Sequence, residues 1–350
     1  MEERRFDPYQ FIGFVLIALI LTWMLYVNRP DEVVSPEVKQ SSTESINEQV
    51  QPALTKLNDS LNRISIETTY GIFSNWMTNN GAKKQELENK ELIIHVNPKG
   101  GVLSLVRLKN YTDYLDQPLD LIKEGNNKFN IQFSTKDGRR LNSRDFYFYP
   151  SMNAENGKQI LSLKANISKN QYLEFIYSID PDKFLVHFSL KSYGLASVLD
   201  TSQPAILEWE NTAYRNSKSI DYENRYTELT YGYDNDKMSY LSATSDDEDE
   251  IDNVKWIGYK QHFFNSILIP ENKIEKVNFK SENLVQSEDK DQMFTKKYYS
   301  DFDVKNSNEI NLNFKWYFGP SEYNILKSYD LGIEDSIYFG WGIFGWINKF

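Results

Sequence analysis

FLVHFSL, residues 184–190, carries apolar side chains at 184, 186, 188 and 190, separated by Leu185, His187 and Ser189. A period of two is typical of a half-buried strand, because successive strand side chains point to opposite faces. The same alternation occurs at 129–133 and 310–316, and short aromatic runs recur at 146–149, 161–167, 172–177 and 262–269. Clusters of Asn, Asp, Gly and Pro separate these runs. The sequence therefore predicts one large β domain over residues 85–318, with antiparallel sheets packed as a sandwich.

The composition of the 350 residues is that of a folded protein. A hydrophobic content of 40% with 15% aromatic residues is ample for a packed core. The net charge is -11 and no run is rich in Lys or Arg, so nucleic acid is not an expected partner. The absence of cysteine excludes disulfides, a thiol nucleophile, a thiolate metal site and a lipid attached to cysteine.

Phe11–Val27, FIGFVLIALILTWMLYV, is an uncharged stretch long enough to be a transmembrane helix. At 1.5 Å per residue these seventeen residues reach roughly 25 Å. Trp23 and Tyr26 near its outer end are suited to the headgroup layer. Arginines precede the span and acidic residues follow it, which favours a cytoplasmic N-terminus and an external main domain.

Two other interpretations of this stretch are weaker. A cleaved signal peptide would end in a small-x-small pattern, whereas the exit reads Asn28-Arg29-Pro30-Asp31. A buried core helix would need apolar neighbours on all sides, whereas a polar stretch follows at once. We therefore expect a retained signal-anchor over residues 1–27.

Residues 28–84 are predicted to be a tether with one short helix. The stretch up to about residue 52 is rich in Ser, Glu, Gln, Val and Pro and lacks apolar periodicity. Leu54, Leu57, Leu61 and Ile64 then recur at helical spacing before a break at 81–84. We expect this apolar stripe to serve packing rather than a partner site.

The acidic run SDDEDEID at 245–252 is interpreted as a surface loop. A dense block of like charge, Asp246 to Asp252, repels itself and stays solvated. A calcium site is the alternative, but the run lacks the central glycine and the spaced terminal glutamate of an EF-hand loop.

The residues give little indication of catalytic chemistry. His95, His187 and His262 lie in separate strand-like runs, and none has the paired spacing of a helical zinc motif. A carbohydrate-active site could still combine a histidine with carboxylates such as Glu223 and Glu228. No nucleophile elbow and no phosphate-binding loop occur in the sequence. We therefore predict no catalytic residue, no cofactor-binding residue and no metal ligand.

Gly340, Gly342 and Gly345 spell G-x-G-x-x-G, but a dinucleotide site is not expected. Such a site needs a preceding strand in a βαβ unit, and bulky Trp341 and Phe344 lie between these glycines. The aromatic character of 319–350, with a lysine near its end, instead predicts the start of an amphipathic segment at the membrane–water interface.

Three segments carry a family resemblance: ELENKELIIHVNPKGGVLSLVRLKNY at 86–111, VKWIGYKQHFFNSILI at 254–269 and WYFGPSEYNILKSYDLGIEDSIYFGW at 316–341. With the anchor and tether before them, they resemble the YidC membrane protein insertases, in the form with an extended periplasmic domain that occurs in Bacteroidetes. The most specific pieces are 99–101, 256–264, 318–320 and 338–341. The resemblance covers the whole chain in order.

This resemblance implies a periplasmic β-supersandwich, similar to galactose mutarotase-like folds, behind one transmembrane helix of the cell inner membrane. It implies a role in the insertion, folding and assembly of integral membrane proteins, with or without the Sec translocon, as an insertase or chaperone rather than a chemical catalyst. The implied partners are nascent membrane proteins, the Sec translocon, SecDF and the lipid bilayer. No cofactor is implied.

Family members insert proteins through a groove in a five-helix core that carries an intramembrane arginine. No position here matches that arginine, so we expect this chain alone to lack the catalytic groove and to be part of a longer gene product. The alternative is a membrane-anchored carbohydrate-binding or mutarotase-like module, with a sugar site and aromatic stacking in a concave sheet face.

Overall fold

The computed structural model describes residues 60–287, 289, 291–305 and 309–337. The chain divides into two compact units, Met1–Leu61 and Asn62–Phe350, and the second contains the described fold. The predicted span Phe11–Val27 and the segment 338–350 lie outside the described residues. Within the residues that are described, no helix combines the length and the apolar character needed to cross a membrane.

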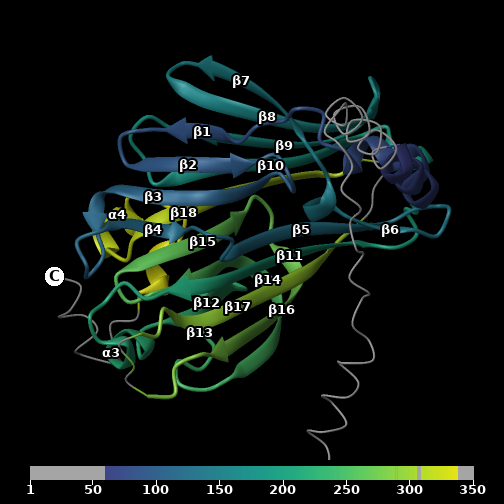
Figure 1. The fold of residues 1–350 in the computed structure, drawn as a ribbon. Coiled ribbons are helices and arrows are strands. Elements are labelled where there is room, and N and C mark those ends of the chain that lie inside the picture. Colours follow the sequence, from purple (N-terminus) through teal and green to yellow (C-terminus); the bar gives the residue numbers. More distant parts are fainter. Residues whose placement is uncertain (1–59, 288, 290, 306–308, 338–350) are drawn as a thin grey trace, which may run out of the picture. The chain divides into compact units, whose positions relative to one another are not determined.

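Two antiparallel sheets form the described part of the second unit (Figure 1). The smaller sheet has the order β1-β2-β3-β4, with β1 Gln85–Glu88, β2 Leu92–Asn97, β3 Val102–Thr112 and β4 Pro118–Ile122. The larger sheet contains β5 Asn127–Ser134, β6 Arg140–Asn142, β7 Tyr149–Glu155, β8 Lys158–Ser168, β9 Gln171–Ile179, β10 Leu185–Tyr193, β11 Ala205–Tyr214, β12 Glu228–Tyr233, β13 Lys237–Tyr240, β14 Asp247–Lys260, β15 Phe264–Pro270, β16 Ile274–Asn283, β17 Phe294–Val304 and β18 Asn311–Pro320.

The larger sheet runs β6-β5-β11-β17-β16-β14-β15-β18-β10-β9-β8-β7, and β12 pairs with β13 and β14. The long strand β14 changes partners along its length. Its first half, 247–254, pairs with β16, whereas 257–260 pairs with both β15 and β12. This change of partner lets one strand join the β16–β17 half of the sheet to the β15–β18 half.

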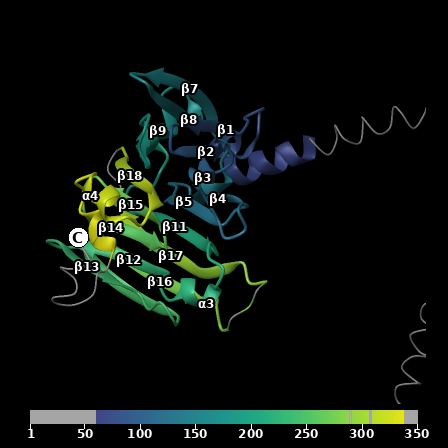
Figure 2. The same ribbon diagram turned by 90° about the vertical axis from the view of Figure 1, so that its left-hand side faces the viewer.

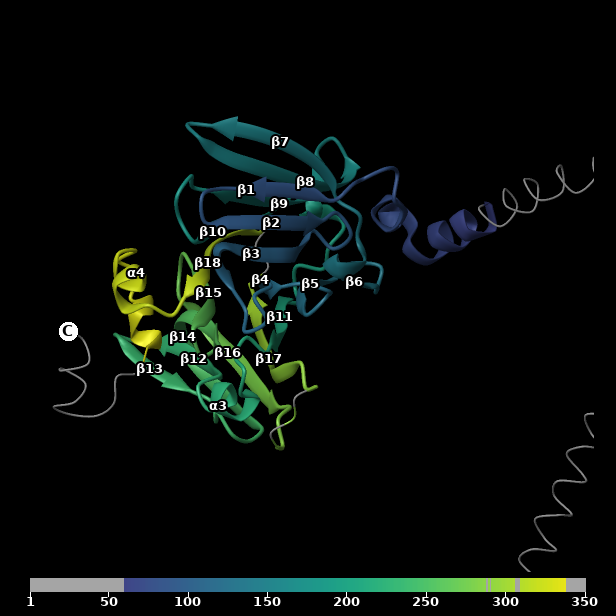
Figure 3. The same ribbon diagram turned by 60° about the vertical axis from the view of Figure 1, so that its left-hand side comes forward.

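The core lies between the two sheets. Strands β1 and β3 contact β8, β9, β5 and β18 of the larger sheet, and Figures 2 and 3 show the smaller sheet beside those strands. At the centre, the ring of Phe188 lies 5.3 Å from Phe129, 5.5 Å from Phe175 and 6.1 Å from Trp316. All four rings are buried, and the Phe188 ring meets Phe129 and Phe175 edge-to-face, a geometry that adds to the stability gained by burial.

Short helices cap the sheets. They are η1 Gly71–Met77, η2 Ser143–Asp145, η3 Leu195–Ser197, α3 Ile220–Asn224, α4 Tyr323–Lys327 and η4 Ile333–Ser336. Ser219 caps α3, because its hydroxyl accepts the N–H of Tyr222 at 3.2 Å. Contacts from α3, from Ser321 before α4 and from η4 surround the β14–β15 turn.

The predicted fold class, mainly antiparallel β, is confirmed. The run 129–133 lies in β5, 161–167 in β8 and 172–177 in β9. Val186, Phe188 and Leu190 in β10 are buried while the side chains between them are half-buried, as the period of two predicts. The run 146–149 is not a continuous strand, because β7 begins only at Tyr149, but Tyr147 forms a single antiparallel bridge with Lys99. Phe146 and Phe148 are buried on either side of half-buried Tyr147, so the alternation is present without a continuous strand.

The acidic run is not a loop. Residues 247–252 are the first six residues of β14, although several of their side chains are exposed, as predicted. The reason is the neighbouring strand β16, which places lysines opposite the acidic side chains. Lys276 contacts Glu250 at 2.6 Å, and Lys280 lies opposite Glu248 in the ladder. Cross-strand pairs of opposite charge remove the repulsion that a run of acids has by itself.

The helix predicted before residue 81 is present over 60–70, followed directly by η1. The expectation that its apolar stripe serves packing is wrong for Leu61 and Ile64, which are 56% and 59% exposed. The packing comes instead from Phe73 and Trp76 of η1, which are buried, with the Trp76 ring 4.6 Å from Phe146. Leu54 and Leu57 lie outside the described residues.

Candidate functional site

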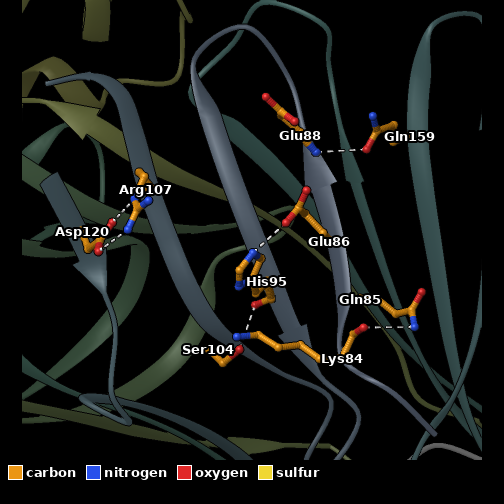
Figure 4. Close-up of polar contacts among 9 residues, drawn as sticks. All are labelled: Lys84, Gln85, Glu86, Glu88, His95, Ser104, Arg107, Asp120 and Gln159. Atoms are coloured by element: carbon orange, nitrogen blue, oxygen red, sulfur yellow. Dashed lines mark hydrogen bonds and ion pairs between the residues drawn. The ribbon is translucent and has the colours of Figure 1, made fainter. Parts of the chain in front are cut away.

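The three histidines do not form one site. His95 in β2 contacts the carboxylate of Glu86 in β1 at 2.8 Å (Figure 4). His187 in β10 lies 3.2 Å from Asp180. His262 lies in the turn between β14 and β15 and packs among aromatic rings. Each histidine therefore has its own local partner.

Polar pairs tie the strands of the smaller sheet together, as Figure 4 shows for His95 and Glu86 and for Arg107 and Asp120. Arg107 Nε and Nη2 donate to the two carboxylate oxygens of Asp120 at 2.7 and 3.0 Å. This two-point geometry joins β3 to β4 and satisfies a carboxylate that is almost fully buried. The arrangement is structural, since both partners are occupied by each other.

Both carboxylate oxygens of Asp180, next to His187, are likewise occupied by partners. Burial alone would raise its pKa, but hydrogen bonds from Lys158 and His187 outweigh burial and hold the pKa of this carboxyl below its usual value. Lys158 Nζ lies 2.6 Å from one carboxylate oxygen while His187 contacts the other. Two basic partners therefore stabilise the ionised carboxylate and leave little capacity for proton transfer to a substrate.

Glu223 and Glu228, the carboxylates singled out in the sequence, lie at one corner of the larger sheet but in different roles. Glu223 in α3 is 1% exposed, and its Oε2 accepts the backbone N–H groups of Asn216 and Ser217, both at 2.8 Å. Burial raises the pKa of Glu223, whereas these two N–H groups and Arg215 lower it. The carboxylate thus fixes the loop before α3.

Glu228 belongs to a second cluster, with two lysines. Its Oε2 pairs with Lys260 Nζ at 3.0 Å across the β12–β14 ladder. Lys296 in β17 is fully buried, and among the described residues its ammonium donates to neutral oxygens of Ala243 and Asn283. Burial lowers the pKa of Lys296 to about 8, while the charges of Glu228 and Asp246 act in the opposite direction. This is the most perturbed amine in the described structure.

Lys296 was missed in the sequence, although the pattern contained a signal. In β17 the inward positions are 296, 298, 300 and 302, and Tyr298, Ser300 and Phe302 are buried there. Extending the period of two back to 296 puts a lysine on the inward face. A charged residue in phase with core residues is a candidate for a special role, because a buried charge needs compensation.

His262 is part of an aromatic stack at the same corner. Its ring lies 4.7 Å from Tyr226 at an interplanar angle of 18°, and 3.8 Å from Phe263 at 29°. Tyr222 of α3 meets the imidazole edge-on at 5.2 Å. Burial in the stack, and next the charge of Lys260, lower the pKa of His262. The imidazole is therefore kept neutral and serves as a packing group.

A shallow groove, here called the β15–β16 groove, lies along the other end of these strands. Three adjoining depressions of about 410, 420 and 390 Å³ share lining residues, among them Pro270, Glu275 and Phe302. Charged side chains of both signs, such as Glu271 and Lys305, line it. Phe302 and Phe314 are 5% and 4% exposed, so these rings present little area to a ligand. Among the described residues, no group of three or more His, Asp or Glu side chains could hold a metal ion.

The family comparison and the similar curated proteins point to one family. The YidC periplasmic domain matches residues 84–350. A protein of Parabacteroides distasonis named membrane protein insertase YidC is 30% identical, over 98% of this chain and 58% of its own length. A protein of the same name from Azobacteroides pseudotrichonymphae is 31% identical, over 98% of this chain and 56% of its own length. The chain thus spans less than three-fifths of the length of these relatives.

Among solved structures, a galactose mutarotase-like protein from Lactobacillus casei is similar, with a TM-score of 0.40 and 10% identity. The likeness covers 67% of this chain and 100% of that one. A putative aldose 1-epimerase from Escherichia coli has a TM-score of 0.40 and 8% identity, over 68% and 99% of the two chains.

Proposed function

Because this chain belongs to the YidC family through its periplasmic domain, we propose that it is part of a membrane protein insertase that assists the insertion, folding and assembly of integral membrane proteins. The observation that carries the proposal is the match of residues 84–350 to that domain, together with relatives named membrane protein insertase that align with 98% of the chain. The proposed substrates are nascent membrane proteins, handled with or without the Sec translocon.

The proposed arrangement has a cytoplasmic N-terminus, a membrane span at Phe11–Val27, a tether over 28–84 and a periplasmic β domain over 85–318 in the cell inner membrane. Arg4 and Arg5, which precede the span, support this orientation, because positively charged flanking residues favour the cytoplasmic side. The Sec translocon and SecDF are the proposed partners of the assembly, and the tether keeps the domain close to them.

We propose a chaperone role rather than chemical catalysis. The state of the buried carboxylates supports this, because Glu223 is occupied by backbone N–H groups and Glu228 by Lys260. A general acid or base must instead be able to reach a substrate proton. His262, stacked on Tyr226 and Phe263, is a packing group rather than a free base.

The carbohydrate-binding alternative requires aromatic faces open to a sugar in a concave site. In the β15–β16 groove the aromatic residues Phe302 and Phe314 are almost fully buried, which favours the insertase proposal over a sugar site. A glycan array probed with the full chain tests the alternative. Specific, saturable binding to one glycan, competed by the same sugar free in solution, would favour the carbohydrate-binding alternative over the insertase proposal.

The insertase proposal is tested by depleting the native gene product in its host and following a reporter inner-membrane protein by protease accessibility. We expect insertion of the reporter to fall on depletion and to recover when the native gene is restored. Protease added to spheroplasts should also digest the β domain from outside. Reporter insertion at the undepleted rate would contradict the proposed function, and a protected β domain would contradict the orientation.

A further inference from the structure

Half of the twelve large apolar side chains that are exposed in the described residues lie at one edge of the molecule. We name it the exit edge, because the described chain ends beside it at Ile337. The six residues and their exposed fractions are Tyr114 37%, Leu115 59%, Tyr222 49%, Tyr226 42%, Phe263 56% and Met293 55%. Scattered apolar residues are normal on a protein surface, but a gathering from four separate chain segments marks an interaction surface.

Arg215, buried at the end of β11, connects three of those segments. Its guanidinium lies 4.8 Å from the ring centroid of Tyr114 in the β3–β4 turn. Its backbone N–H donates to the carbonyl of Met293 at 2.7 Å, and its Nε donates to Ser217 at 2.8 Å. Glu223 then holds Ser217 and thereby α3, which carries Tyr222. The turn, the strand end and the helix are therefore fixed relative to one another.

The other side of the exit edge is built on the β14–β15 turn. Phe263 stacks on His262, and its carbonyl accepts the N–H of Ser321 at 2.7 Å, two residues before α4 begins at Tyr323. Asn265 donates to Ser336 of η4 at 3.2 Å. The last described residues are thus tied to the turn that exposes Phe263. Figure 1 shows α3 and α4 along the same side of the ribbon.

The chemistry of the exit edge suits the headgroup layer of a bilayer. Four of its six exposed side chains are aromatic, and three of these are tyrosines, whose rings are apolar with a polar tip. Exposed Lys218 and Arg225 lie among them, and so do exposed Asp116 and Glu322. Because both signs of charge are present, the surface matches zwitterionic headgroups rather than a purely anionic layer.

The sequence that follows supports the same occupant. Directly after Ile337 the chain reads YFGWGIFGWINKF at 338–350, in which six of thirteen residues are aromatic, one is basic and none is acidic. Such a composition partitions to the membrane–water interface. A domain whose last described element leads into an interfacial sequence presents the edge around that point to the same bilayer.

We propose that the exit edge docks on the bilayer surface, with Phe263, Tyr226 and Leu115 in the headgroup layer. This inference rests on the proposed function only in that the domain must be held beside a membrane. It adds that the domain has a defined orientation there, with α3 and the β14–β15 turn toward the lipid. Strand β7 lies on the far side, opposite α3 in all three ribbon views (Figures 1, 2 and 3).

The chain contains no cysteine, so single cysteines can be labelled without background. The experiment uses the full chain reconstituted into phosphatidylcholine vesicles, with Phe263→Cys or Leu115→Cys carrying an environment-sensitive fluorophore. Met152→Cys on exposed β7 is the matched control. Leu115→Cys lies outside the His262 stack, so it reports docking even where Phe263→Cys disturbs the turn.

We expect the labels at 263 and 115 to be quenched by nitroxide-headgroup lipid several-fold more strongly than the label at 152, and to be protected from aqueous iodide. Equal iodide quenching at all three positions would overturn the proposal. So would protection from iodide without nitroxide quenching, because residues 338–350 would then cover the edge. If the labels lose their protection from iodide when the protein is diluted into more lipid, a second copy of the chain rather than the bilayer covers the edge, and the proposal is overturned. Failure of the chain to float with the vesicles would count against the proposed function, and is distinguishable from these results.

Discussion

Glu223 holds the backbone N–H of Asn216 at 2.8 Å with an oxygen that also accepts the N–H of Ser217, so one buried carboxylate fixes the loop that precedes its own helix. This contact links the sheet end at Arg215 to the exposed ring of Tyr222. Removing it should loosen one corner of the domain while leaving the aromatic core between the sheets intact.

Glu223→Ala should lower the free energy of unfolding by about 1 to 3 kcal/mol, because two part-buried N–H groups lose their acceptor. Hydrogen exchange of the amides from 215 to 227 should accelerate, while amides of β9 and β10 stay protected. Glu155→Ala, on the exposed end of β7, is the control and should change neither quantity. Unchanged exchange at 216 and 217 would show that the loop does not depend on the carboxylate.

Gly101→Ala should be markedly destabilising. Gly101 has a φ of +63°, and an added Cβ would lie 2.8 Å from the ring of Phe175. The left-handed conformation alone costs about 1 to 2 kcal/mol for alanine, and the clash adds about 1 to 3 kcal/mol. Gly125→Ala separates the two effects, because Gly125 has a φ of +78° with nothing within 4 Å of the added atom. Equal losses of unfolding free energy in the two variants, measured by urea denaturation, would refute a role for the Phe175 contact.

Lys296 should make stability depend on pH in the alkaline range. Its pKa is about 8 in the folded protein against an ordinary 10.5, so the unfolded chain holds the extra proton between these values. Raising the pH through this window therefore favours the folded state. The urea midpoint should rise more between pH 8 and 10.5 in the parent than in Lys296→Met, measured side by side. A larger rise of the urea midpoint in the variant would contradict the lowered pKa of Lys296.

His262 should titrate below its ordinary pKa of 6.5, because burial and the charge of Lys260 disfavour the imidazolium. A histidine that is held neutral contributes stability above the unfolded pKa, and this contribution is lost as the pH falls below that value. Imidazole resonances of the chain, with His262→Gln used for assignment, give the midpoint directly. A midpoint at or above 6.5 would mean that the stack does not exclude water.

The strands could be predicted from the sequence because the pattern that indicates them is local. In β5 and β10 the period of two follows from each residue and its second neighbour, so Ile131 and Phe188 could be assigned to a core face without any tertiary information. The prediction of a loop for the acidic run was wrong for the opposite reason. Its strand conformation depends on Lys276 and Lys280, about 30 residues away in β16, which no local window relates to it.

Composition, periodicity and short motifs are properties of neighbouring residues, so they were enough to predict a β-rich protein with a long uncharged segment near its N-terminus and a YidC resemblance. Which exposed residues share a surface became visible only in the folded chain. Tyr114, Phe263 and Met293 come from distant segments, and each alone is an ordinary exposed residue. They meet because Arg215 and the β14–β15 turn join those segments through hydrogen bonds and ring contacts, and such contacts depend on the fold as a whole.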